Sequence, residues 1–198
     1  MIWSDYNFKT YGKDIVKPFN LECLQPNSYE LHLDDEVKIA TETGWISKKL
    51  PFTITQGQFV LASTLEVVKI PQRATGRVLG KSSIARLGMP VEFAGLIDTG
   101  FEGQITLEMY VLAHPIELKP KMPIAQLIIE DSYPCDRLYG ECNNHYQHQK
   151  GATLSWMDKK GWRFYGRDFV VLASSVAMIG FMYISELVYT PQIIGIFY

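Results

Sequence analysis

The feature that most constrains the fold is a series of short β-rich segments between residues 20 and 130. The segments are Ser28–Leu33, Phe59–Val68, Gly76–Val78, Gln104–Leu112 and Ile124–Glu130. Turn residues separate them at Pro51, Gly57, Pro71, Gly100, Gly103 and Pro120. No long stretch in this part of the chain has the periodicity of a surface helix. The pattern predicts a mostly β domain, a barrel or sandwich with jelly-roll character.

Short helices are expected at residues 12–17 and at Ser82–Leu87, where a serine can cap the first turn. The 198 residues suffice for one domain with a substantial core. Residues 131–168 are polar and weakly patterned, which is typical of a mobile loop or of an arm that orders over something. We expect one domain over residues 1–160, including this arm, and an apolar extension over residues 161–198.

Within the extension, residues 169–184 are largely apolar. The run is just shorter than the roughly 18 residues expected of a membrane span. A buried element, packed on the domain or at a subunit interface, is the favoured interpretation. A membrane-associated tail and a poorly ordered appendage are the alternatives that the sequence leaves open.

Composition narrows the class of partner and the compartment. The formal net charge is −2 without a block of basic residues, which disfavours nucleic acid as the main partner. The three cysteines are sparse and odd in number, so a reduced compartment is expected. The spacing of Cys135, Cys142, His145 and His148 fits no common zinc site. The N-terminus does not resemble a secretory signal, and we expect a cytoplasmic protein.

One stretch carries the residue types of a nucleotide site. Lys81, Ser82 and Ser83 combine a cation, two hydroxyls and freed backbone amides, which suit a phosphate chain, although an ordinary turn has the same composition. The Walker spacing is missing. Asp98 follows an apolar strand and suits a sugar hydroxyl, but a turn aspartate often caps its own backbone.

Glu108 and Gln126 are polar residues within apolar strands. By the period of two, Glu108 shares a face with Thr106 and Tyr110. If that face is exposed, Glu108 is a surface residue; if it lines a cavity, desolvation raises its pKa and suits it to general acid or base chemistry. A buried Gln126 amide must be hydrogen-bonded, so it either ties down a loop or faces a ligand.

Taken together, these residues resemble the dCTP deaminases of the trimeric dUTPase superfamily over roughly residues 12–158. The matching segments, in order, are Pro18-Phe19, Leu24–Leu33, Gly80–Gly88, Ala94–Glu108, Pro123–Ile129 and Tyr146–Ser155. Each motif alone is modest, but their order and spacing are specific. The resemblance implies a dUTPase-like distorted β-barrel that forms a homotrimer, with active sites between subunits, each closed by a C-terminal arm.

The resemblance also implies roles for individual residues. Ser82, Ser83 and Arg86 of one subunit would meet the triphosphate and the catalytic site, with Lys81 beside them. Asp98 would hold the deoxyribose 3′-hydroxyl, and Phe101 would pack under the sugar and disfavour a 2′-hydroxyl. The residues that would contact phosphates or close the arm are Gln126, Tyr146 and Gln149.

Glu108 would activate water for attack at C4 of cytosine and pass the proton to ammonia. Such enzymes work without zinc, unlike the zinc deaminases, whose signature is missing here. Magnesium bound through the triphosphate is the expected ion.

Three departures from the family pattern bear on the reaction. Lys81 stands where arginine is usual, and His145 replaces a lysine before the arm tyrosine. The linker between Arg86 and Asp98 is one residue shorter than in typical deaminases, and Ala94–Asp98 resembles the dUTPase motif that positions the hydrolytic water. We therefore expect deamination of dCTP to dUTP, with or without further hydrolysis to dUMP and pyrophosphate. The alternatives are a plain dUTPase and a non-catalytic, nucleotide-binding or membrane-tethered homologue.

Overall fold

The computed structural model describes residues 1–91, 95–142 and 144–156. The chain divides into two compact units, Met1–Leu154 and Ser155–Tyr198, and every element described below belongs to the first unit. The apolar run at residues 169–184 lies outside the described residues. None of the helices in the described ranges is long and apolar enough to cross a membrane.

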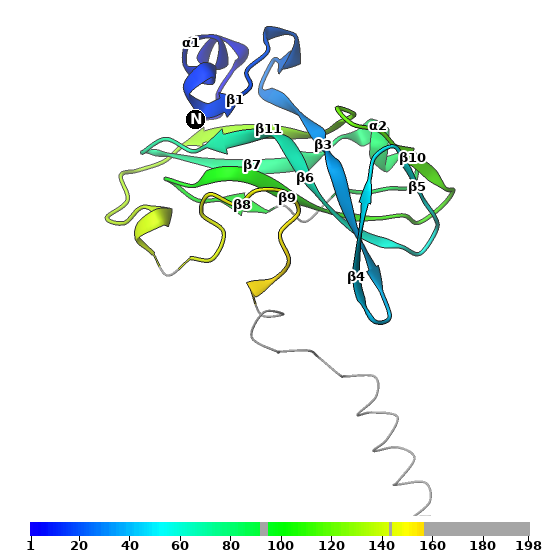
Figure 1. Ribbon diagram of the computed structural model, residues 1–198. Coiled ribbons are helices and arrows are strands. Elements are labelled where there is room, and N and C mark those ends of the chain that lie inside the picture. Colours follow the sequence, from blue (N-terminus) through cyan, green and yellow to red (C-terminus); the bar gives the residue numbers. More distant parts are fainter. Residues whose placement is uncertain (92–94, 143, 157–198) are drawn as a thin grey trace, which may run out of the picture. The chain divides into compact units, whose positions relative to one another are not determined.

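Antiparallel strands are the main secondary structure of the first unit (Figure 1). The strands are β1 (Val16–Lys17), β2 (Leu24–Gln25), β3 (Ser28–Thr41), β4 (Gly44–Lys49), β5 (Phe52–Ile54), β6 (Phe59–Lys69), β7 (Ala74–Gly80), β8 (Leu96–Ile97), β9 (Glu102–Tyr110), β10 (Ile116–Leu118) and β11 (Pro123–Asp131). Among the described residues, nine strands form one sheet in which β1, β6, β3, β11, β7 and β8 are successive neighbours. Strand β9 pairs with β6, β2 and β4 pair with β3, and β5 and β10 form a separate pair.

The mostly β prediction is confirmed, and all five predicted segments lie largely within strands. The main difference in extent is β3, which continues to Thr41, eight residues past the predicted end. Its second half pairs with both β4 and β6, so these neighbours hold it extended although it carries several charged residues.

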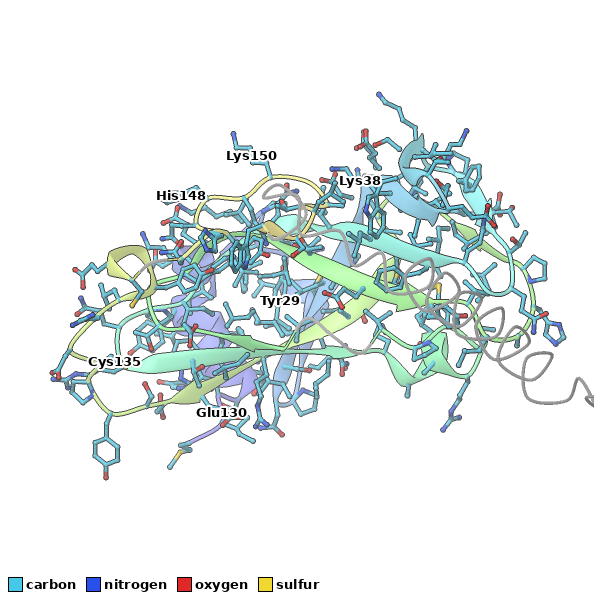
Figure 2. The ribbon with its side chains drawn as sticks, turned by 90° about the horizontal axis from the view of Figure 1, so that it is seen from below. Tyr29, Lys38, Glu130, Cys135, His148 and Lys150 are labelled. Carbon is cyan, nitrogen blue, oxygen red and sulfur yellow. The ribbon has the colours of Figure 1, made fainter. Side chains whose placement is uncertain are left out.

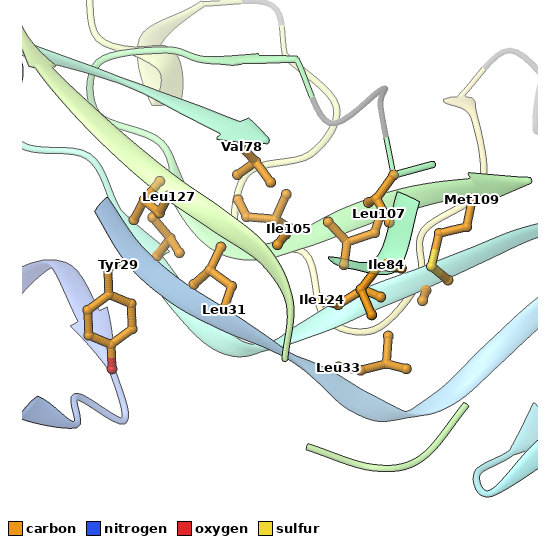
Figure 3. Close-up of a cluster of buried hydrophobic side chains, with 14 of the residues drawn as sticks. Tyr29, Leu31, Leu33, Val78, Ile84, Ile105, Leu107, Met109, Ile124 and Leu127 are labelled. Atoms are coloured by element: carbon orange, nitrogen blue, oxygen red, sulfur yellow. The ribbon is translucent and has the colours of Figure 1, made fainter. Parts of the chain in front are cut away.

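The core follows the alternation of the long strands. In β9 the odd-numbered residues are buried and the even-numbered ones are partly exposed. The same period places Tyr29, Leu31 and Leu33 of β3 inside. Figure 3 shows side chains of β3, β7, β9 and β11 meeting in one apolar cluster, together with Ile84. This shared core fixes the register of the strands that carry the candidate site.

The N-terminal helix corrects a prediction. Helix α1 spans Asp5–Ile15 rather than residues 12–17. It begins at a capping box, in which the Ser4 N–H donates to the Asn7 side chain at 3.0 Å. It ends because β-branched Val16 enters β1 and pairs with Val68. Gly12 lies inside the helix, where a Cβ atom would come within 2.3 Å of Phe19.

The short helix α2 (Ser82–Ala85) begins where the sequence predicts and ends earlier. Its N-cap is Lys81, and no side chain caps it, so the expected serine cap is wrong. Two further 3-10 turns, η1 (Leu21–Cys23) and η2 (Tyr139–Glu141), complete the described helical elements.

Candidate functional site

Strand β9 presents Glu108 on the face opposite the main core. Leu107 and Met109 are buried, whereas Thr106 and Glu108 are half-buried, which confirms the predicted alternation. Burial raises the pKa of the Glu108 carboxyl, because partial removal of water disfavours its charged form. A carboxyl with a raised pKa takes up a proton at a higher pH than a solvated glutamate does, which suits it to general acid or base chemistry.

Asp98 follows β8 and lines a pocket of about 670 Å³. Its backbone carbonyl accepts the N–H of Phe101 at 3.1 Å, and the Thr99 hydroxyl fixes the turn by donating to the Ala74 carbonyl at 2.6 Å. Among the described residues, no hydrogen bond joins the Asp98 carboxylate to its own turn. The predicted alternative, a turn aspartate that caps its own backbone, is therefore not what the described residues show.

Tyr139 lines the pocket beside Asp98, and Phe101 packs behind it. Phe101 is buried, and the Tyr139 ring meets it edge-on with 5.5 Å between ring centres. The Tyr139 N–H donates to the Thr99 carbonyl at 2.8 Å. Burial raises the pKa of the Tyr139 hydroxyl, and the nearby negative charge of Asp98 adds to this. Sequence reasoning missed Tyr139, because it lies in the weakly patterned region after β11.

Helix α2 holds three of the predicted residues at the surface. Ile84 is buried in the core, and this anchor leaves Ser82, Ser83 and Arg86 exposed. The turn is closed by hydrogen bonds of 3.0 Å from the Ile84 and Ala85 N–H groups to the Lys81 carbonyl. The hydrogen-bonded turn and the buried Ile84 thus hold the Ser82 and Ser83 hydroxyls and the Arg86 guanidinium at the surface.

Lys81 already has a partner within the chain. Its ammonium pairs with the carboxylate of Glu30 on β3, and both side chains are only about one-fifth exposed. His32 continues the cluster, with Nε2 3.8 Å from Glu30 and Nδ1 2.7 Å from Glu66. Glu66 is 3% exposed, and it also accepts the His32 backbone N–H at 2.9 Å. A cation expected to serve phosphate therefore holds α2 to β3.

Sequence reasoning missed this cluster of Glu30, His32 and Glu66. Alternating charged residues on a strand usually mark a solvated face. The burial of Glu66 depends on an irregularity of β6 between Ser63 and Val67, which only the folded register reveals.

Gln126 lies beside the same cluster. On β11 it is paired with Glu30 of β3 on one side and with Leu79 of β7 on the other. Directly opposed residues project to the same face of a sheet. Gln126 is half-buried, so its amide belongs to the surface that Glu30 and Lys81 share.

The segment after η2 behaves as an arm that packs along the start of β9. The Gln147 amide bridges the strand, accepting the Glu102 N–H and donating to the Gly100 carbonyl, both at 3.1 Å. The His148 N–H donates to the Glu102 carbonyl at 2.7 Å, and the Thr153 N–H donates to the Thr106 hydroxyl at 3.2 Å. Figure 2 labels His148 and Lys150 on this arm and Cys135 on the loop before it.

Two predicted arm residues have different surroundings. Tyr146 lines the Asp98 pocket and packs against the core. Gln149 instead exchanges contacts with Gln104: its Nε2 donates to the Gln104 carbonyl at 2.7 Å, and its carbonyl accepts the Gln104 N–H at 3.1 Å. Neither Gln104 nor Gln147 was singled out by sequence reasoning, and an isolated glutamine carries no signal of such a contact.

The candidate residues fall into separate groups within one chain. Asp98 and Tyr146 line one pocket, with Phe101 behind its wall, and that pocket's lining includes neither Glu108 nor α2. Lys81 and Gln126 meet at Glu30 on another surface. A single copy thus presents the candidate residues on more than one surface.

No group of three or more His, Cys, Asp or Glu side chains in the described ranges could hold a metal ion. The three cysteines are in thiol form, with Cys23 buried and Cys135 and Cys142 exposed.

Comparison with known proteins gives concordant results. A family described as dCTP deaminase-like matches residues 5–132. A protein of Hydrogenobaculum named "dCTP deaminase, dUMP-forming" is 40% identical over 172 residues, covering 78% of this chain and 95% of the relative. One of the same name from Nanoarchaeum equitans is 37% identical over 179 residues, covering 73% and 90%.

Among solved structures, the 2′-deoxycytidine 5′-triphosphate deaminase of Agrobacterium tumefaciens superposes with a TM-score of 0.58. The match covers 66% of this chain and 48% of that one, at 17% identity. At this identity the likeness establishes the fold alone.

Proposed function

This chain belongs to the dCTP deaminase-like family, and from that premise we propose that it converts dCTP to dUMP in two hydrolytic steps. In the first, dCTP and water give dUTP and ammonia. In the second, dUTP and water give dUMP and pyrophosphate. The observation that carries the proposal is Glu108, a half-buried carboxyl with a raised pKa on a strand of this family's fold.

Glu108 is the group that moves the proton in the first step. It takes a proton from water, which attacks C4 of the cytosine, and delivers the proton to the departing ammonia. A carboxylate whose pKa is raised by burial is a stronger base than a solvated one.

The Asp98 pocket takes the sugar. The exposed carboxylate accepts a hydrogen bond from the 3′-hydroxyl, and the buried Phe101 ring, braced by Tyr139, supports the deoxyribose and disfavours a 2′-hydroxyl. The pocket volume of about 670 Å³ is large enough for a nucleoside.

The phosphate chain is bound by Ser82, Ser83 and Arg86 from α2, assisted by Gln126, Tyr146 and Gln149. Arg86 carries the main positive charge in this group, because the Lys81 charge is paired with Glu30. Mg²⁺ enters on the triphosphate as part of the substrate.

A complete site needs more than one copy of the chain. Because the Asp98 pocket excludes Glu108 and α2, we propose a homotrimer in which neighbouring subunits supply the missing groups. A cytoplasmic location is also proposed, supported by three cysteines that remain free thiols.

The second step is supported by a specific local feature. The turn that carries Asp98 is preceded by a linker one residue shorter than in typical deaminases, and the exposed carboxylate can orient a water. The same feature favours the second candidate function, a dUTPase that does not act on dCTP.

The deciding experiment is incubation of the purified protein with Mg²⁺ and either dCTP or dUTP, followed by ammonia assay and chromatography of the nucleotides. We expect ammonia and dUMP from dCTP, and dUMP from dUTP. Release of no ammonia from dCTP would refute deamination, and dUMP formed from dUTP alone would identify a plain dUTPase.

A further inference from the structure

Gln104 lies where strand β9, which carries Glu108, contacts the arm. It lies on β9, four residues before Glu108 and on the same half-buried face. Its Oε1 accepts the N–H of Gly151 at 2.6 Å. Its backbone carbonyl and N–H both bond to Gln149. One residue therefore makes three hydrogen bonds to the arm.

The amide nitrogen of Gln104 is held by two acceptors. Its Nε2 donates to the Asp34 carboxylate and to the Thr64 carbonyl, each at 2.8 Å. Because a carbonyl and a carboxylate only accept, they require the NH₂ group on their side. The amide orientation is thus determined by its partners, and Oε1 must face Gly151.

These partners are themselves fixed. The second oxygen of Asp34 accepts the Asp35 N–H at 2.9 Å, and the Ser63 hydroxyl lies 3.3 Å from the first. The Thr64 hydroxyl accepts the N–H of Ile105 at 2.9 Å, at the irregular point of β6. Strands β3, β6 and β9 therefore converge behind the Gln104 amide.

The backbone next to Gln104 is shaped for close approach of the arm. A Cβ atom on Gly103 would lie 3.1 Å from the Gln149 nitrogen and 3.3 Å from its oxygen. A side chain at residue 103 would crowd the Gln149 backbone, which would have to shift to make room. The close packing therefore acts on Gln149 and the directed amide on Gly151, two neighbouring points of the arm.

We infer that Gln104 is a positioning residue, a latch oriented by Asp34 that fixes the register of the arm against the strand carrying Glu108. The inference rests on the proposed function, in which Tyr146 and Gln149 of the arm close over the nucleotide. With the latch, the arm is already ordered before substrate binds. Without it, the binding-competent arm is only a fraction of the population, and apparent affinity falls by that fraction.

The test uses Gln104→Ala, with Gln58→Ala as the matched control. Gln58 is also half-buried and makes one side-chain bond to a backbone N–H, that of Thr55 at 2.8 Å. We expect Gln104→Ala to raise amide hydrogen exchange at residues 149–153 at least about tenfold, and to raise KM for dCTP about tenfold with kcat within about twofold. Gln58→Ala should change neither.

A second pair of variants separates the effect of the orientation of the Gln104 amide from the effect of its side-chain packing. Gln104→Glu keeps the acceptor for Gly151 but sets a carboxylate against Asp34, so it should loosen the arm as Gln104→Ala does. Adding Asp34→Asn restores a donor facing residue 104 and should return arm exchange and KM most of the way toward wild type. Thermal unfolding of each variant checks that the fold is intact.

Unchanged arm exchange in Gln104→Ala would overturn the latch, as would a fall in kcat at constant KM or failure of Asp34→Asn to rescue. The exchange measurement needs no substrate. If wild-type protein releases no ammonia from dCTP, the proposed function fails while arm exchange still decides the latch.

Discussion

At the scale of single residues, Glu108 and Asp98 show how one fold gives two carboxyls different properties. Glu108 lies on a strand where the neighbouring sheet removes part of its water, and burial raises its pKa. Asp98 stands on an exposed turn beside a pocket, where its carboxylate is accessible from solvent. The first is suited to proton transfer and the second to accepting hydrogen bonds from a substrate hydroxyl or a water.

Replacing Glu108 tests this division. Glu108→Gln should lower ammonia release from dCTP by about a thousandfold, the middle of the range for loss of a general base. Hydrolysis of dUTP should be nearly unchanged, because Asp98 is intact. Parallel loss of both reactions would contradict separate roles.

The pH dependence of deamination follows from the same pKa. The base must be ionised, so the rate should fall as pH falls through the raised pKa, at a pH above the ordinary glutamate value of 4.5. Between 4.5 and that raised pKa the native protein binds a proton more tightly than the unfolded chain, so stability falls as pH rises. Glu108→Gln should therefore be at least as stable as wild type at pH 7, which thermal unfolding can check.

At the scale of elements, one set of α2 residues holds the turn in place and another set is exposed for the proposed contact with phosphate. Ile84 holds the helix from the core side, and the Lys81–Glu30 ion pair holds its N-terminal end to β3. Ser82, Ser83 and Arg86 then project without contributing to the anchor. A short helix is too small to be stable alone, so these contacts keep its exposed groups in place.

Two matched substitutions distinguish the anchor from the binding group. Lys81→Met should lower the free energy of unfolding by about 1–3 kcal/mol, since Glu30 loses its cation in a largely buried position. Arg86→Met should leave stability within about 0.5 kcal/mol but abolish nucleotide turnover. Denaturant unfolding measures the first effect and the product assay the second; equal stability of the two variants would mean that the Lys81–Glu30 pair does not anchor the turn.

The limits of sequence reasoning also appear at this scale. Long strands such as β6 and β9 were predicted well, because the β-rich composition that marks them is local in the sequence. The N-terminal helix begins earlier than predicted because a capping box starts it after Ser4, and it ends at Ile15 because Val16 pairs with β6. The Gln104 contacts and the Glu30–His32–Glu66 cluster could not be predicted, because they join residues more than thirty positions apart.

At the scale of the whole molecule, the separation of the candidate residues suggests assembly. Glu108 and α2 lie outside the lining of the pocket that contains Asp98 and Tyr146. Exposed apolar side chains such as Leu79, Leu87 and Leu112 offer surface for contact between copies.

Co-expression of two inactive variants tests whether sites are shared. If Glu108 and Arg86 of one site come from different subunits, mixing Glu108→Gln with Arg86→Ala restores sites that have both groups. Random mixing at equal amounts should recover about one quarter of wild-type deamination. No recovery, in mixed oligomers verified by mass, would place both residues in the same subunit.

The packing of the arm against β9 also affects the tendency of the protein to aggregate. Strand β9 has β6 on one side, and on the other the arm takes up the backbone groups of Glu102 and Gln104. An open strand edge is a template on which other chains can add and aggregate. We therefore expect proteolytic loss of the arm to uncover this edge of β9 and to favour aggregation of the protein.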